Sequence, residues 1–208
     1  MRNKIGKLFM LLGSLLILGS LVLFSRNLQE TSDAEYQSHE VLAEIRQELQ
    51  IAEETQSNEI EFIPDIPVEL LTEEDLTMTE VMIDGHGYIG YLTIPDLGLE
   101  LPIMSDWSYK QLKIAPCRYD GTLRGKDLVI MAHNYKTHFG RLSKLSLGAS
   151  VIFTDMDSNA WPYEIVAIDV LEPTAVEEMT AGEYDLTLFT CTPGGSYRVT
   201  VRCMQIQN

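Results

Sequence analysis

The sequence from His86 to the C-terminus constrains the fold most, because Gly, Pro, Asn and Asp divide it into short apolar runs. The runs are rich in β-branched and aromatic residues, which favour strands. Seven runs are strand candidates: GYIGYLTIP, LELPIM, DLVIMAH, SVIFTD, PYEIVAIDVLE, YDLTLFTC and YRVTVRCMQI. Seven or eight short strands in about 120 residues predict a mainly β fold, a closed barrel and not alternating βα units. Residues 137–145 and 173–179 have the composition of short helices.

The first 26 residues differ in character from the rest of the chain. Three basic residues precede an uncharged apolar stretch, Leu8 to Phe24, and Arg26 ends it. Its 17 residues are at the lower limit for a membrane-crossing helix. A cleaved signal peptide is the alternative, but its apolar part is usually about 7 to 15 residues long and precedes a small-x-small site, which is not evident here. We expect residues 1–26 to be a single-pass signal anchor in the cell membrane, with the N-terminus cytoplasmic and the remaining chain extracellular.

The net charge of −16 is concentrated in one segment. Residues 1–26 carry four bases and no acids, residues 27–85 carry seventeen acids and Arg46, and residues 86–208 carry fourteen acids and ten bases. We therefore predict an acidic extracellular stalk over 27–85 and a catalytic β-barrel over 86–208. Apolar residues at helical spacing between positions 41 and 51 predict a helix in the stalk, and residues 62–82 predict an extended or loosely helical connection. The acidity argues against nucleic acid as a partner, because phosphate binding needs a basic surface.

The three cysteines are an odd count, which does not fit a small module built on disulfides. One disulfide and one free thiol is the alternative. A thiol becomes a nucleophile as a thiolate, which needs a proton acceptor and positive charge nearby. Cys191 ends one apolar run and His133 ends another, so the two side chains can meet if both strands end at one rim. We expect Cys117 and Cys203 to be packed or partly exposed, as free cysteines commonly are.

The alternation of the last run suggests which arginine lies near Cys191. In YRVTVRC one face carries Tyr197, Val199, Val201 and Cys203, and the other carries Arg198, Thr200 and Arg202. Arg198 is nearer to the preceding turn, so we favour it as the group that stabilises an oxyanion. Arg202 is then interpreted as a charge at the surface or just behind the site.

The histidines offer an alternative to His133. His138 follows in the same loop, and we interpret it as solvated because His133 directly ends the apolar strand. His39 and His86 are expected to face solvent. A zinc site from Cys117, His133 and His138 lacks CxxC or HxxxH spacing.

Acidic residues around FTDMDSN, with Glu177 and Glu178, are the one candidate for a calcium site. Carboxylates near a turn are usually solvated, so we predict no metal and no cofactor.

These residues together resemble a known family. TLFTC followed by an arginine, the histidine in LVIMAHNY, the amino-terminal anchor and GYLTIPDLGLELPIM are similar to the sortases, the cysteine transpeptidases of Gram-positive bacterial surfaces. The resemblance covers roughly Gly87 to Cys203. It implies an eight-stranded sortase β-barrel without a cofactor. It also implies partners of two kinds: a surface protein or pilin with a sorting signal, and an amine acceptor such as a peptidoglycan precursor or a pilin lysine.

The resemblance assigns roles by motif position. Cys191 is the nucleophile that attacks the Thr-Gly bond of an LPxTG-like signal. His133 is the general acid for the leaving amine and then the base for the incoming one. Arg198 stabilises the oxyanion, and Thr190 helps to shape the groove that binds the substrate.

The subclass stays open. CTP and R-x-x-V-R are similar to class C, but an Asp-Pro-aromatic lid motif is not evident. AHNY is more similar to class B, which usually has a long helix before the cysteine strand. Class C, class D and a related clostridial-type group are all compatible. The competing functions are a noncatalytic, membrane-tethered β-barrel binding module and a cysteine peptidase that hydrolyses its substrate.

Overall fold

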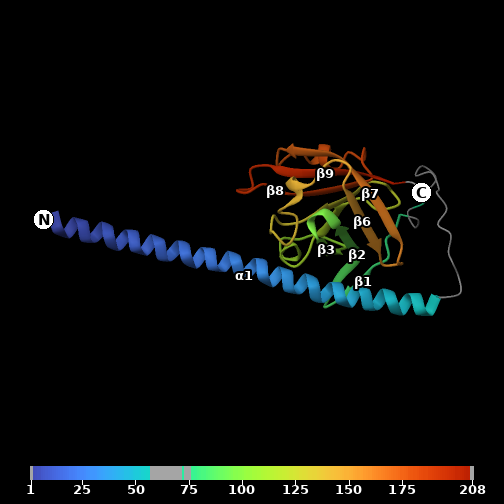
Figure 1. Ribbon diagram of the computed structural model, residues 1–208, viewed down its shortest axis with the longest axis horizontal. Helices are drawn as coiled ribbons and strands as arrows, with labels where there is room; N and C mark the ends of the chain where they lie inside the picture. The colour runs from blue at the N-terminus through green and yellow to red at the C-terminus, as the bar shows by residue number, and fades with distance from the viewer. Residues whose placement is uncertain (1, 57–71, 73–75, 207–208) are drawn as a thin grey trace.

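A computed structural model describes residues 2–56, 72 and 76–206 as one long helix and a β-barrel (Figure 1). The helix α1 (Arg2–Gln56) extends away from the barrel at its N-terminal end and runs alongside the barrel over its second half (Figure 1). Most of the connection predicted over residues 62–82 lies outside the described residues.

The described strands close into an eight-stranded barrel. Their order is β2 (His86–Ile94), β3 (Leu99–Met104), β4 (Cys117–Asp120), β5 (Leu128–Met131), β8 (Leu186–Cys191), β9 (Arg198–Gln205), β7 (Ala160–Leu171) and β6 (Ser150–Asp155), which pairs back to β2. The β3–β4 and β5–β8 pairs are parallel, and the other pairs are antiparallel. A short strand, β1 (Val81–Ile83), pairs with the start of β2 outside this ring. The mainly β, closed-barrel prediction is therefore confirmed.

All seven predicted runs form strands, but the eighth strand of the barrel was not predicted. This strand is β4, whose sequence CRYD is short and mostly polar, so it lacks an apolar pattern. Both predicted short helices are present, as η4 (Leu142–Lys144) and α2 (Val176–Met179). Two further single turns are η2 (Pro95–Leu97) and η3 (Gln111–Lys113).

The barrel closes where β2 meets β6, and Gly90 makes this close approach possible. Its φ is +143°, a region that residues with a side chain rarely adopt. A Cβ at this position would lie 2.1 Å from the backbone oxygen of Thr154. Inside the ring, apolar side chains such as Leu92, Ile130 and Val201 are fully buried and form the main core.

The second half of α1 packs against the barrel and is not the free acidic stalk that its composition predicts. Val41, Ile45 and Leu49 join a buried cluster with Tyr88 and Met104 of the barrel. These helix positions are four residues apart, so they form one apolar stripe. The acidic residues between Glu30 and Glu48 lie on the exposed side of the helix. The division of the chain at residues 26 and 85 stays a prediction, although α1 continues without a break through the first of these boundaries.

Candidate active site

Adjacent strands bring the predicted cysteine and histidine together at one end of the barrel. β5 and β8 are parallel neighbours, and each paired residue of β8 is 58 positions after its partner in β5. The Thr190 hydroxyl continues this register by donating a hydrogen bond to the Ala132 oxygen at 2.8 Å. The next residues along the two chains are His133 and Cys191, again 58 positions apart, so the register places them side by side.

Arg198 flanks Cys191 on the opposite side. β9 pairs with β8 in antiparallel register, with Arg198 directly opposite Cys191, and such pairs have Cβ atoms about 4.5–5.5 Å apart. The connecting turn is closed by the Thr192 amide, which donates to the Tyr197 oxygen at 2.9 Å. Arg198 Nη1 donates to the backbone oxygens of Gly195 and Tyr197 at 3.1 and 3.2 Å. The guanidinium is thus held against the turn beside the cysteine.

The cysteine points out of the barrel. Alternation along β8 directs Leu186 and Leu188 into the core, where both are fully buried. Phe189 and Cys191 therefore face outward, and Cys191 is half-buried. Its sulfur is accessible to a substrate, as a nucleophile requires.

The electrostatics of His133 are set by burial and by two opposite charges. Burial lowers the pKa of its imidazole, and the positive charge of Lys113 lowers it further, whereas the carboxylate of Glu30 on α1 acts in the opposite direction and raises the pKa. Lys113 and Glu30 also form an ion pair, with Nζ and Oε1 3.6 Å apart. The ring of Tyr135 lies against the imidazole, with 4.9 Å between the ring centroids.

The other two cysteines are packed inside the protein, as predicted. Cys117 and Cys203 are fully buried, and burial raises the pKa of each thiol to about 12. Neither is a thiolate near neutral pH. All three cysteines are free, so the alternative of one disulfide is wrong.

His138 is not the solvated loop residue that we predicted. It is fully buried, and its Nε2 lies 3.5 Å from the Ser38 hydroxyl of α1. Burial, and then the charge of His133, lower its pKa to about 4. Its Nδ1 has no hydrogen-bond partner among the described residues. His39 is exposed as expected, whereas His86 is half-buried.

Arg202 is also buried, with 4% of its surface exposed, so of its two predicted positions the one at the surface is wrong. The guanidinium donates to the backbone oxygens of Glu178 and Met179 at 2.7 and 3.1 Å, and to the Thr187 hydroxyl at 3.1 Å. These bonds tie α2 to the outer face of β8 and β9. Arg202 therefore supports the strands that carry Cys191 and Arg198, and it is too enclosed to compete with Arg198 at the site.

Thr190 lies on the inner face of β8, with 3% of its surface exposed. Its hydroxyl bonds to Ala132, the residue before His133. Its role in shaping a substrate groove stays a prediction. We infer that it positions His133 relative to Cys191.

An aromatic surface lies next to the site and was not predicted. The Phe189 ring packs edge-on against Tyr119, with 5.3 Å between the centroids, and Tyr119 in turn lies 5.7 Å from Trp107. Trp107 is 41% exposed and lines an open depression with Tyr119, Arg118 and neighbouring residues. Phe189 is two residues before Cys191, so this surface leads toward the cysteine.

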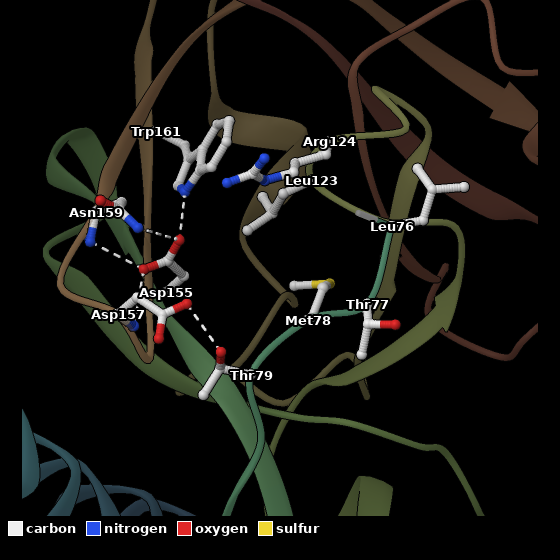
Figure 2. Close-up of a pocket in the computed structure, with 10 residues that line it drawn as sticks. All are labelled: Leu76, Thr77, Met78, Thr79, Leu123, Arg124, Asp155, Asp157, Asn159 and Trp161. Carbon is white, nitrogen blue, oxygen red and sulfur yellow. Dashed lines mark hydrogen bonds between the residues drawn. The ribbon is translucent and has the colours of Figure 1, made fainter. Parts of the chain in front are cut away.

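A second pocket lies at the other end of β5, where the loop before this strand contributes Leu123 and Arg124 (Figure 2). Its central acid is Asp155, whose carboxylate accepts hydrogen bonds from Asn159 and the Trp161 indole, at 2.8 Å for the indole (Figure 2). Asp155 is part of the FTDMDSN segment considered for calcium. Its oxygens are engaged in holding the β6–β7 turn, and no three His, Cys, Asp or Glu side chains of the described residues are grouped as metal ligands.

The comparisons with known proteins agree on one family. The family model for the sortase domain matches residues 92–206. Among solved structures, sortase C1 from Streptococcus suis is 30% identical with a TM-score of 0.53, and the match covers 59% of this chain and 75% of that one. Sortase D5 from Clostridium perfringens has a TM-score of 0.59 at 17% identity, covering 83% and 99%. Sortase C from Streptococcus pneumoniae has a TM-score of 0.53 at 24% identity, covering 80% and 90%. A search of curated proteins found no match.

The chain belongs to the sortase family, because the family model matches more than half of it. It is therefore a cysteine transpeptidase with a sortase barrel. Both class C and class D structures are among the matches, so the fold leaves the subclass open.

Proposed function

We propose that this sortase is anchored in the membrane by α1 and joins a protein with an LPxTG-like sorting signal to an amine outside the cell. The arrangement of β5, β8 and β9 supports the proposal: the parallel β5–β8 register leads toward His133 and Cys191, and Arg198 pairs with Cys191 across β8 and β9. A nucleophile between a proton carrier and a fixed cation is the arrangement that acyl transfer requires.

The proposed reaction has two halves. The Cys191 thiolate attacks the carbonyl carbon of the Thr-Gly bond, while Arg198 donates hydrogen bonds to the oxyanion. The C–N bond then breaks, the His133 imidazolium gives its proton to the leaving amine, and a thioester remains on Cys191. An incoming amine loses a proton to His133 and attacks this thioester, so that the C–S bond breaks and the thiolate is restored.

The reaction uses the thiolate together with the imidazolium, and the environment of His133 limits how often both exist. Because burial and Lys113 lower the pKa of His133, its imidazolium is a minor form near neutral pH. We infer that a fraction of the enzyme carries the active pair at any time, as expected for coupled titrations.

The first half of α1 supports the proposed membrane anchor. Its large apolar residues between Leu8 and Phe24 are exposed on all sides of the helix, and none of them contacts the barrel. A helix that is apolar all round is suited to lipid. The hydroxyls of Ser14 and Ser20 bond to helix carbonyls, so they are satisfied without water.

The proposed partners are a sorting-signal protein and an amine from a peptidoglycan precursor or a pilin lysine. The full-length enzyme in detergent should cleave an LPxTG-type fluorogenic peptide and form a new amide when an amine is added. Mass spectrometry should detect an acyl adduct on Cys191, and Cys191→Ala should lose both activities, about 10³-fold or more. Cys203→Ala is the matched control and should retain turnover.

The alternatives give different results in the same experiment. Peptide binding without any adduct would favour a noncatalytic binding module. Cleavage with water as the only acceptor, whatever amine is offered, would favour a hydrolysing peptidase. Cleavage that persists in Cys191→Ala would contradict the proposed chemistry.

A further inference from the structure

We propose that α1 is a working part of the active site, because Ser38 on this helix and His138 on the loop after β5 position His133. This inference rests on the proposed role of His133 as the proton carrier. Neither Ser38 nor His138 touches the reacting atoms, so both are positioning residues.

The loop from His133 to Gly140 is a single closed unit. The Phe139 amide donates to the His133 oxygen at 3.3 Å, and the amides of His138 and Gly140 both donate to the Tyr135 oxygen, at 3.0 and 2.9 Å. The loop is also tight, since a Cβ on Gly140 would lie 2.4 Å from the Asn134 oxygen. A displacement of His138 is therefore transmitted to His133.

The contact between His138 and α1 defines the state of the imidazole. Ser38 Oγ donates its one hydrogen to the Ile114 oxygen at 3.0 Å. Its oxygen can then accept a hydrogen bond from His138, whose Nε2 is 3.5 Å away, and this assigns a ring proton to Nε2. Burial lowers the pKa of His138 to about 4, so the imidazole is neutral near pH 7. Both residues are buried, His138 fully and Ser38 to 3% exposure, so water cannot replace the bond.

The Nδ1 atom of His138 has no hydrogen-bond partner among the described residues, which indicates that this side chain is not there for stability alone. A buried nitrogen without a partner lowers stability, and a leucine of similar size would fill the same space without that penalty. The distinct contribution of a histidine at this position is the hydrogen bond to the helix.

Aromatic packing connects this contact to the catalytic histidine. The ring of Tyr135 lies between the two imidazoles, with its centroid 4.9 Å from His133 and 5.5 Å from His138. Ser38, His138, Tyr135 and His133 thus form an unbroken chain of contacts from α1 to the site.

The helix makes a second contact two turns earlier. Glu30 pairs with Lys113, and the Ile114 oxygen that Ser38 binds belongs to the next residue. The charges that act on His133 from the neighbouring elements are Lys113, the last residue of η3, and Glu30, on α1. Arg198 and Cys191 flank it in the barrel. Docking of α1 therefore fixes both the position of the imidazole and one of the charges near it.

The test uses the full-length enzyme in detergent and two pairs of variants. Ser38→Ala removes the hydroxyl, and Ser32→Ala, at an exposed position on the same helix, controls for the change in helix propensity. His138→Leu removes the hydrogen bond, and His138→Gln keeps an N–H donor at the end of the side chain. Ser38→Ala and His138→Leu should lower kcat about 10-fold with KM within twofold, since small displacements of a catalytic group are costly. Ser32→Ala should be unchanged, and His138→Gln should recover most of the loss.

The pH dependence of Cys191 alkylation by iodoacetamide separates a positioning role from a general loss of stability, because it reports on the surroundings of the thiol. Because Cys117 and Cys203 are buried, the reaction reports on Cys191, and mass spectrometry verifies the modified residue. If His133 moves relative to Cys191, the pH profile of the alkylation rate in Ser38→Ala and His138→Leu should differ from that of the unmodified enzyme and of Ser32→Ala, with little change in the thermal unfolding midpoint.

The two proposals fail in different ways. Alkylation and kcat profiles of Ser38→Ala and His138→Leu that match those of Ser32→Ala would overturn the positioning role, while the proposed reaction would stand. Absence of any acyl adduct in the unmodified enzyme would overturn the proposed reaction, and the alkylation profiles would still decide whether α1 positions His133.

Discussion

The two halves of α1 belong to one uninterrupted helix but have different surfaces. In the first half apolar residues cover every side, and the large ones between Leu8 and Phe24 are all exposed. In the second half Val41, Ile45 and Leu49 form a stripe that the barrel buries, and most of the exposed positions are polar or charged. An all-round apolar surface is suited to lipid, whereas a stripe needs a protein neighbour. The acidic residues between Glu30 and Glu48 thus describe only the exposed side of a docked helix.

The largest effect is expected from a charge placed in the buried stripe of α1. Ile45 is fully buried in the cluster between α1 and the barrel. Ile45→Asp should lower the free energy of unfolding by about 4 kcal/mol or more, because the carboxylate would have no partner there. Both tryptophans are in the barrel region, so urea unfolding followed by their fluorescence measures the effect. Gln47→Asp, on the exposed side, should change stability by less than about 0.5 kcal/mol. Equal stability of the two variants would mean that the stripe is not docked in solution.

A charge in the middle of the first half of α1 should weaken membrane insertion and leave the stability of the barrel unchanged. Leu16→Arg should weaken membrane insertion by about 2.5–3.5 kcal/mol, because arginine is costly at the centre of a membrane helix. The fraction of protein that stays in carbonate-washed membranes measures this change. Barrel unfolding should be unaltered, since Leu16 is 66% exposed and contacts no part of the barrel. Full retention in the membrane would argue against this stretch as the anchor.

A smaller effect on stability is expected from Arg46, a partly exposed residue of α1 that contacts the barrel. Arg46 pairs with Glu100, and its guanidinium lies 5.9 Å from the centroid of the Tyr91 ring. The Arg46 side chain is 50% exposed, so Arg46→Ala should cost only about 0.5–1 kcal/mol of unfolding free energy. A double-mutant cycle with Glu100→Ala separates the ion pair from the ring contact. A coupling energy near zero would assign the contribution to Tyr91.

The smallest effect concerns the charge that α1 brings to His133. Glu30 raises the pKa of this histidine, so Glu30→Gln should lower that pKa and reduce the imidazolium fraction at any given pH. The limb of the pH–activity profile that depends on His133 should move to lower pH, by less than about half a unit at low salt, and the shift should vanish near 1 M salt. Glu40→Gln, at an exposed site on the same helix, is the control. A shift toward higher pH would contradict the assigned sign.

The sequence predicted those strands that have an apolar pattern within their own residues. The seven apolar runs became strands, and the positions of Cys191 and His133 at the ends of two runs indicated a shared rim. β4 was missed because CRYD has little apolar pattern, and it forms only through pairing with its neighbours. Its position between β3 and β5 could not be read from four mostly polar residues.

The errors at the site have one physical origin, which is burial by elements distant in the sequence. His138 looks like a loop residue until α1, about 100 positions earlier, covers it. Arg202 occupies a polar strand face until α2 closes over that face. Strand alternation predicts two faces but not what packs on each. Two of the supporting groups, Tyr135 and His138, lie within HNYKTH and so are close to His133 in the sequence, but their contacts could not be predicted from it.

If α1 is the membrane anchor that we propose, its uninterrupted course determines how far above the lipid the active site lies. If the lipid boundary is at Arg26, the helix rises about 1.5 Å per residue from there, so Ser38 lies about 18 Å above it along the helix axis. The helix contains no proline, so nothing in it serves as a hinge between anchor and barrel. With the proposed anchor, an acceptor amine would have to reach this level on its own tether, and the length of that tether would be a criterion for which acceptors can react.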